Sequence, residues 1–180
     1  DDLIDLQKEL KDKSEVPQYV WDVLSNMPKD SHPMAMFNTA ILSMQKESQF
    51  AEAYDLVISK GDYWETTLED GLNIIAKLPA IGAAIYRMRF NKGDRLNAGD
   101  SIDWSENFLQ MIGFDYSDDM LKMMQLYLML HCDHEGGNVS TFSALTVNSA
   151  LSDPYYSLSA GLNGLAGPLH GLANQNNLKF

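Results

Sequence analysis

The chain has 180 residues, of which 45% are hydrophobic and 21% are charged, a composition typical of a folded globular protein with a hydrophobic core. Its formal net charge of -12 argues against nucleic-acid binding and against an anionic membrane surface, because both need a basic face. Cys132 is the single cysteine, so no disulfide can form within the chain. No apolar run approaches the ~20 residues of a membrane helix. We therefore expect neither a nucleic-acid nor a membrane partner.

Apolar residues at helical spacing dominate the first half of the chain. Leu3, Leu6 and Leu10 predict a short first helix, and Val16-Pro17 starts a second one. Proline at position 33 predicts the start of a third helix over residues 33–47. The residues expected to face inward in this helix are Met34, Phe37, Ile41, Leu42 and Met44.

The longest helical pattern covers residues 63–90. We expect Pro79 to kink or interrupt it, because proline removes one backbone donor. We expect both ends of the segment to be buried. Trp64 and Leu68 belong to one apolar face of this helix. Gly82 and its alanine neighbours would permit another helix to approach closely.

Residues 91–102 form a polar loop, and Asp103-Trp104 begins the next helical run. Ser117 is the predicted N-cap of a further helix that reaches Leu130. Four methionines in this helix, at positions 120, 123, 124 and 129, are interpreted as core residues, with a soft partner-binding surface as the second interpretation. No alternating strand pattern occurs, so the sequence predicts an all-α fold.

Residues 131–140 carry polar side chains directly after this apolar helix. Gly136 and Gly137 turn the chain tightly, which presents His134 where it can face a ligand. Asn138 and Ser140 lie at the start of the next helix, where they could cap it or contact a substrate.

A second candidate histidine follows the helix that starts at Pro154. His170 comes just after Pro168, which we expect to open another helix. The positive end of that helix dipole would favour a neutral imidazole, which can donate a hydrogen bond to a carbonyl as an enolate forms.

Other roles for these side chains remain open at this point. His131 fits a structural role, and His131, Cys132, Asp133, His134 and His170 could together be zinc ligands. Their spacing matches no standard site, so we expect no metal. A nucleophilic Cys132 lacks a recognisable partner arrangement.

Three segments, residues 134–140, 149–155 and 163–175, resemble eukaryotic mitochondrial citrate synthases in order and spacing. The resemblance extends upstream through five shorter segments: residues 32–34, 63–65, 75–79, 85–87 and 103–105. It therefore covers nearly the whole chain, as the N-terminal to middle portion of such an enzyme.

The resemblance implies condensation of oxaloacetate with acetyl-coenzyme A (acetyl-CoA) to give citrate, with acetyl-CoA as a co-substrate and no permanently bound cofactor. His170 matches the catalytic histidine that hydrogen-bonds the thioester carbonyl, and Ser140 matches the residue that orients it. His134 and Asn138 match oxaloacetate-binding positions. Lys60 stands where the family has an arginine near the coenzyme A phosphate, and Leu169 is a second candidate coenzyme A contact.

By the same resemblance, residues 1–180 form part of the large helical domain, with the active-site segment at 131–175 and the small domain absent. The aspartate base, a second histidine and the substrate arginines of the family would lie after Phe180, so we expect this chain alone to be inactive. Residues 141–148 and 176–180 also depart from the family pattern. The alternative is a truncated, non-catalytic structural or assembly subunit.

The family forms homodimers through antiparallel helices, which here correspond to residues 33–47, 63–90, 154–166 and 169–180. The resemblance further implies the mitochondrial matrix. Since Asp1-Asp2-Leu3 does not look like a signal or transit peptide, an imported protein would be present here in mature or trimmed form.

Overall fold

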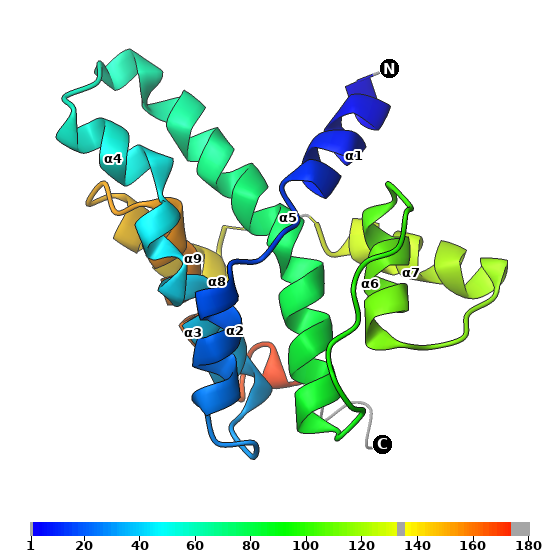
Figure 1. Cartoon of the computed structure of the whole chain (residues 1–180). Helices are drawn as coiled ribbons and strands as arrows, with labels where there is room; N and C mark the ends of the chain where they lie inside the picture. Colours follow the sequence, from blue (N-terminus) through cyan, green and yellow to red (C-terminus); the bar gives the residue numbers. More distant parts are fainter. Residues whose placement is uncertain (1, 133–135, 174–180) are drawn as a thin grey trace. The chain divides into compact units, whose positions relative to one another are not determined.

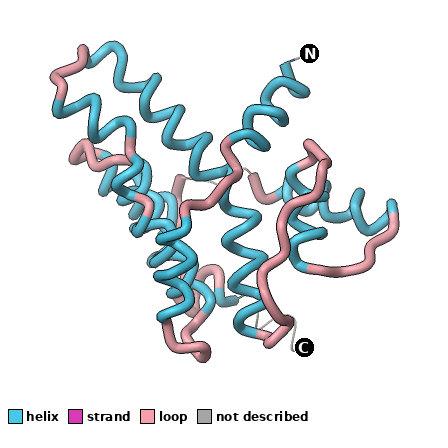
Figure 2. Tube along the Cα trace, in the orientation of Figure 1, coloured by secondary structure: helices cyan, strands magenta, loops and turns pink. Residues whose placement is uncertain are grey.

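The computed structural model describes residues 2–132 and 136–173, and every regular element in these ranges is helical (Figures 1 and 2). The α-helices are α1 (Asp2–Asp12), α2 (Gln18–Asn26), α3 (Pro33–Ser43), α4 (Gln49–Asp55), α5 (Tyr63–Arg89), α6 (Trp104–Ile112), α7 (Asp118–Leu130), α8 (Val139–Asn148) and α9 (Pro154–Leu165). Two 3-10 turns, η1 (Gln45–Glu47) and η2 (Lys60–Asp62), precede α4 and α5. The predicted all-α fold is confirmed.

Helix starts follow the capping residues of the sequence. The side chain of Asp103 accepts a hydrogen bond from the backbone N–H of Glu106, and Ser117 does the same for Met120. Asp153 caps α9, whose first residue is Pro154. These side chains satisfy N–H groups that a helix leaves without internal partners, which explains why these boundaries could be predicted.

The chain divides into two units, each with its own buried residues. The first comprises the described residues of 1–37 and 71–133. Its core contains Ala83, Met111 and Ile112, with Phe108 packed against them. A β-carbon placed on Gly82 would lie 3.6 Å from the Phe108 ring, an ordinary van der Waals distance, so the packing at this position does not require glycine.

The second unit comprises the described residues of 38–70 and 134–180. Here α9 buries Tyr155, Ser157, Ser159, Gly161 and Leu162. Helices α8 and α9 pack closely, since a β-carbon on Gly161 would lie only 3.1 Å from the carbonyl oxygen of Ser140. This packing brings the two predicted site segments together.

Three expectations about buried faces are wrong within this chain. In α5, Trp64 is 62% exposed and Leu68 is 53% exposed. In α7 no residue is buried, so the interpretation of its methionines as core is incorrect; Met123 and Met129 are both exposed. In the segment 33–47, Ile41 and Met44 are buried as predicted, whereas Leu42 is exposed and Met36 and Ala40 are buried in addition. Apolar spacing identified the helices but did not distinguish a face covered within the chain from one left open.

Helix α5 includes Pro79 and continues beyond it, so the proline does not interrupt the helix. Helix α4 was not predicted at all.

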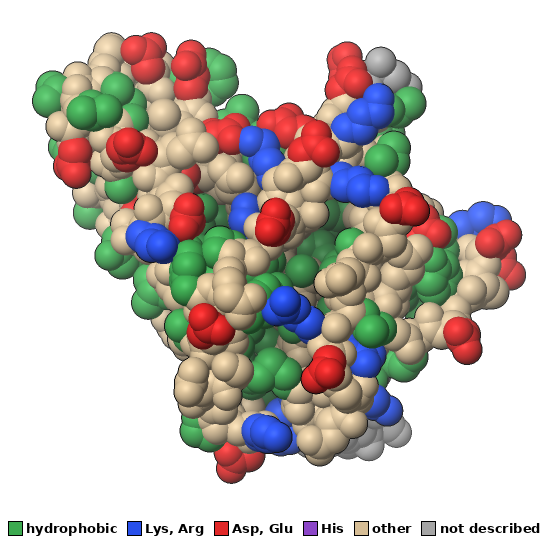
Figure 3. Space-filling view, in the orientation of Figure 1, with side chains coloured by type: hydrophobic (Ala, Val, Ile, Leu, Met, Phe, Trp, Pro, Cys, Tyr) green, Lys and Arg blue, Asp and Glu red, His purple; other side chains and the backbone are tan. Residues whose placement is uncertain are grey.

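Figure 3 shows acidic side chains spread over the visible face, in agreement with the formal net charge of -12. Among the described residues, no helix is long and apolar enough to cross a membrane.

Candidate functional site

The candidate site lies in the second unit, where the start of α8 meets the turns that follow α9. Asn138 is the N-cap of α8, and its Oδ1 accepts a hydrogen bond from the backbone N–H of Thr141 over 2.9 Å. Ser140 lies in the first turn of this helix. The capping role thus holds both side chains at a helix N-terminus.

Ser140 links Asn138 to His170. Its hydroxyl oxygen lies 2.6 Å from Asn138 Oδ1 and 2.9 Å from His170 Nε2. The sequence predicted this association of Ser140 with His170, which are 30 residues apart in the chain. A serine hydroxyl has one proton, so it can donate to only one of these two neighbours.

The proton arrangement follows from the shorter contact. Asn138 Oδ1 is an acceptor, because it already receives the N–H of Thr141, so the Ser140 hydroxyl donates to it. The Ser140 oxygen then accepts from His170, which places the imidazole proton on Nε2 and leaves Nδ1 as the acceptor nitrogen. If the hydroxyl rotates to donate to His170 Nε2, the tautomer reverses and Nδ1 becomes the donor.

Tight turns after α9 position His170. The backbone N–H of His170 donates to the carbonyl of Gly167, and that of Gly171 donates to the carbonyl of Leu165, both over 3.0 Å. A β-carbon on Gly171 would lie 2.6 Å from the Leu165 carbonyl oxygen, so this turn requires glycine.

The expected helix start at Pro168 is wrong. Residues 168–171 form turns, and helical geometry begins at Leu172. The helix-dipole argument for His170 therefore has no basis in the described residues, whereas the hydrogen bond between Ser140 and His170 does bear on its tautomer.

The remaining predicted residues lie in different settings. His134 lies outside the described residues. Lys60 is exposed in η2, and Leu169 is 99% exposed in the turns before His170. His131 contacts the carbonyl of Tyr127 through Nδ1 over 2.7 Å, which agrees with the structural interpretation of this histidine.

Asp133 also lies outside the described residues, while Cys132 is exposed with its thiol directed to the carbonyl of Leu128. Within residues 2–132 and 136–173, no three His, Cys, Asp or Glu side chains are arranged to hold a metal ion.

No sequence pattern predicted a buried acidic group in the second unit. Asp70 is fully buried in α5 and accepts hydrogen bonds from Ser48 Oγ and from the backbone N–H groups of Gln49 and Phe50. Burial raises the pKa of Asp70, and these three hydrogen bonds oppose the increase. Asp70 joins α5 to the start of α4, the helix that periodicity also failed to predict.

Comparison with known proteins shows which family the chain resembles. A family model for the citrate synthase C-terminal domain matches residues 1–180. The mitochondrial citrate synthase of Daucus carota is 47% identical over 170 residues, which cover 94% of this chain and 36% of that protein. The peroxisomal citrate synthase of Saccharomyces cerevisiae is 49% identical and covers 97% of this chain and 38% of that protein.

Two solved structures share the fold. A citrate synthase from Pyrobaculum aerophilum superposes with a TM-score of 0.85 at 31% identity, covering 95% of this chain and 42% of that one. A citrate synthase from Thermoplasma acidophilum, solved with carboxymethyl coenzyme A and oxaloacetate, gives a TM-score of 0.77 at 26% identity, covering 93% of this chain and 41% of that one. The chain spans less than half the length of each of these relatives. The family model and the identities show that it belongs to the citrate synthase family.

Proposed function

We propose that the protein carrying this chain condenses acetyl-CoA with oxaloacetate to form citrate and coenzyme A in the tricarboxylic acid cycle. The observation that carries the proposal is the hydrogen-bonded series Asn138–Ser140–His170, since it controls which imidazole nitrogen can donate. The complex of the Thermoplasma acidophilum relative with a coenzyme A derivative and oxaloacetate supports this choice of substrates.

His170 is the proposed hydrogen-bond donor to the thioester carbonyl. As a base removes a proton from the acetyl methyl group, negative charge develops on the carbonyl oxygen, and a donor already in place stabilises that charge. The enolate carbon then attacks the oxaloacetate ketone. Hydrolysis of the resulting thioester releases citrate and coenzyme A.

Ser140 orients His170 in this scheme and does not react itself. In the structure its hydroxyl donates to Asn138, which keeps the imidazole proton on Nε2. Donation from Nδ1 requires the hydroxyl to turn toward His170. We infer that the hydroxyl turns in this way in the substrate complex, which leaves the imidazole proton on Nδ1 for the thioester carbonyl.

The other substrate contacts extend this proposal. His134 and Asn138 bind oxaloacetate, and the exposed ammonium of Lys60 suits a coenzyme A phosphate. Leu169, which is 99% exposed directly before His170, offers an apolar contact to coenzyme A. The aspartate base, second histidine and substrate arginines that the family resemblance implies are not among these residues, so we expect residues 1–180 alone to be inactive.

A homodimer is the proposed assembly, and α5 supplies its main support. Trp64, Leu68 and Ile75 follow helical spacing and are 62%, 53% and 45% exposed, so this helix has an apolar face that the chain itself does not cover. Such a face in a helix of 27 residues suits an antiparallel copy of itself. We also propose the mitochondrial matrix, although the similar relatives include a peroxisomal enzyme.

The test is a coenzyme A thiol-release assay with acetyl-CoA and oxaloacetate, performed on the protein that carries this chain, on its His170→Ala variant and on residues 1–180 alone. We expect citrate and free thiol from the first and a loss of at least ~10²-fold in the variant. Absence of citrate from the first protein, in a folded dimer, would instead establish the structural or assembly subunit.

A further inference from the structure

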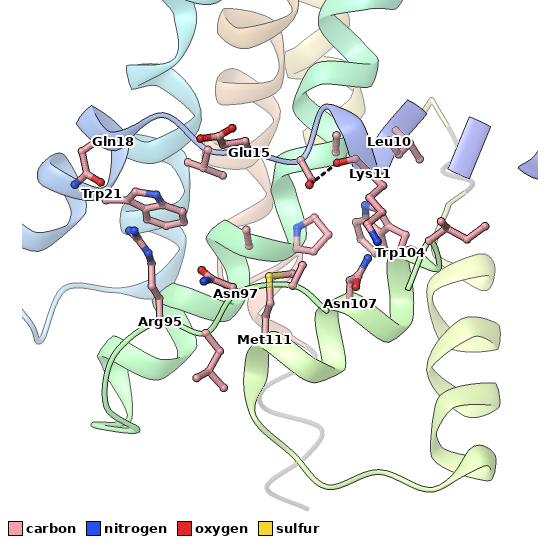
Figure 4. Close-up of a pocket in the computed structure, with 18 residues that line it drawn as sticks. Leu10, Lys11, Glu15, Gln18, Trp21, Arg95, Asn97, Trp104, Asn107 and Met111 are labelled. Atoms are coloured by element: carbon pink, nitrogen blue, oxygen red, sulfur yellow. Dashed lines mark hydrogen bonds between the residues drawn. The ribbon is translucent and has the colours of Figure 1, made fainter. Parts of the chain in front are cut away.

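The first unit contains a cavity of about 320 Å³ that the proposed condensation does not use. It lies between the end of α1, Trp21 of α2, the middle of α5, the loop after α5, and α6 (Figure 4). Small residues explain why space remains there, because α5 contributes only Ala76, Pro79 and Ala80. Packing voids in protein interiors rarely exceed the size of a few waters, whereas ligand sites begin at roughly 300 Å³.

Aromatic and apolar groups form one part of the cavity wall, and Ser14, Gln18, Asn97 and Asn107 add polar side chains to it. Figure 4 shows the indoles of Trp21 and Trp104 on opposite sides, with Met111 between them. The Trp104 indole is held in place, since its Nε1–H donates to the carbonyl of Ile75. Two indoles with Met111 between them suit a flat hydrophobic ring.

Two cationic side chains also line the cavity. The guanidinium carbon of Arg95 lies 4.7 Å from the centroid of the Trp21 ring. A guanidinium that stacks on an aromatic ring through its face keeps the N–H donors at its edge available for a carboxylate. Lys11 donates to the backbone carbonyl of Asp100. Among the described residues neither cation has a carboxylate partner, in a chain whose formal net charge is -12.

Glu15 is the acidic side chain on the cavity wall. Figure 4 shows its carboxylate directed away from Met111 and Asn107, so it does not compete for the interior. The cavity therefore combines a hydrophobic slot with positive charge on its wall. We propose that it binds a small aromatic carboxylate, with the ring between the two indoles and the carboxylate on Arg95.

The probe is 2-naphthoate, followed through the indole N–H signals of ¹⁵N-labelled chain, which are assigned with Trp→Phe variants. Of the three tryptophans, Trp21 and Trp104 line the cavity, while Trp64 belongs to the second unit and serves as an internal control. We expect saturable shifts at Trp21 and Trp104 and none at Trp64. 2-Naphthylmethanol, which lacks the charge, and cyclohexanecarboxylate, which lacks the aromatic ring, should each bind roughly tenfold more weakly.

Two variants separate the charge from the slot. Arg95→Gln should abolish the preference for naphthoate over naphthylmethanol, whereas Lys122→Gln, on the exposed α7, should preserve it. Ala80→Leu should fill the cavity and remove binding of both compounds. No saturable shift, an equal shift at Trp64, or unchanged selectivity in Arg95→Gln would overturn the proposal. Because the readout is binding to the first unit, its failure is distinguishable from failure of citrate formation.

Discussion

The indole of Trp104 donates its N–H to the carbonyl oxygen of Ile75 over 3.0 Å. In an α-helix that carbonyl would accept from the N–H of residue 79, but Pro79 has none. Trp104 therefore replaces the hydrogen bond that proline removes from α5. This replacement accounts for a helix that continues through a proline.

Trp104→Phe should lower the free energy of unfolding by about 1 kcal/mol, because the indole donor is lost while the ring shape is largely kept. The expected cost is moderate, since the hydrogen bond lies at an exposed position where water can reach the carbonyl. Urea unfolding of the variant and the parent chain, with matched slopes, gives the difference.

Pro79→Ala provides the matched test for this assignment, because alanine restores the missing N–H. In the Pro79→Ala background, Trp104→Phe should cost less than it does in the parent chain. A double-mutant cycle cancels the separate effect of the smaller alanine side chain. Equal costs in both backgrounds would show that Trp104 acts only through packing.

Asp70 and Glu106 should give opposite pH dependences. Burial raises the pKa of Asp70 above 3.8, so the folded state holds this proton more tightly than the unfolded state. The stability of the parent chain relative to Asp70→Asn should therefore be greatest below the pKa of the unfolded state. It should decline as the pH rises through the higher pKa of the folded state.

Hydrogen bonds from Ser101 and Tyr116 lower the pKa of Glu106 below 4.5. The stabilisation of the parent chain relative to Glu106→Gln should therefore be complete above pH 4.5. It should decline as the pH falls through the pKa of the folded state. Urea unfolding from about pH 3 to about pH 6 measures both differences. Slopes of the same sign for the two pairs would contradict these environments.

Two glycines should respond to alanine in opposite directions. A β-carbon on Gly164 in α9 would lie 3.1 Å from Val139 Cγ1 and 3.3 Å from Ser140 Cα, so Gly164→Ala should force α8 away at a cost of about 1–3 kcal/mol. A β-carbon on Gly71 in α5 would meet nothing within 4 Å. Gly71→Ala should thus stabilise the chain by about 0.5–1 kcal/mol, and thermal unfolding distinguishes the two outcomes.

Sequence reasoning predicted the parts of this structure that depend on local chemistry. Ser117 caps α7 as expected, and the next helical run begins at Asp103-Trp104 as expected, because a helix start depends mainly on its own next few residues. It also predicted that Ser140 orients His170, but this came from the family motif rather than from spacing. Asp70 could not be found in this way, since its burial depends on the position of α4. The exposed face of α5 was misassigned because apolar periodicity does not reveal whether the chain itself covers that face.

Leu68→Lys should weaken the proposed homodimer, because it places a charge in the apolar face of α5 where the wild-type side chain is 53% exposed. Leu3→Lys is the matched control, since Leu3 is 64% exposed on α1, which is not among the proposed dimer helices. Sedimentation velocity of the folded proteins should show dissociation only for Leu68→Lys. A monomeric parent, or a dimer that tolerates Leu68→Lys, would contradict an interface through α5.

Ser140→Ala tests the hydrogen-bonded series at the candidate site. Without the hydroxyl, His170 loses the partner at 2.9 Å that controls the position of its proton, so the ¹⁵N shifts of both ring nitrogens should change. In the protein that carries this chain, kcat should fall on the order of 10²-fold, because the imidazole no longer presents its donor reliably to the thioester. KM for oxaloacetate should change little if Ser140 acts through His170.

Ser149→Ala is the control. It removes a hydroxyl that donates to the carbonyl of Thr146, and it should leave kcat and the His170 signals unchanged. A loss of activity in Ser140→Ala with unaltered ring shifts would mean that Ser140 contributes through the packing of α8 on α9 instead of through the tautomer.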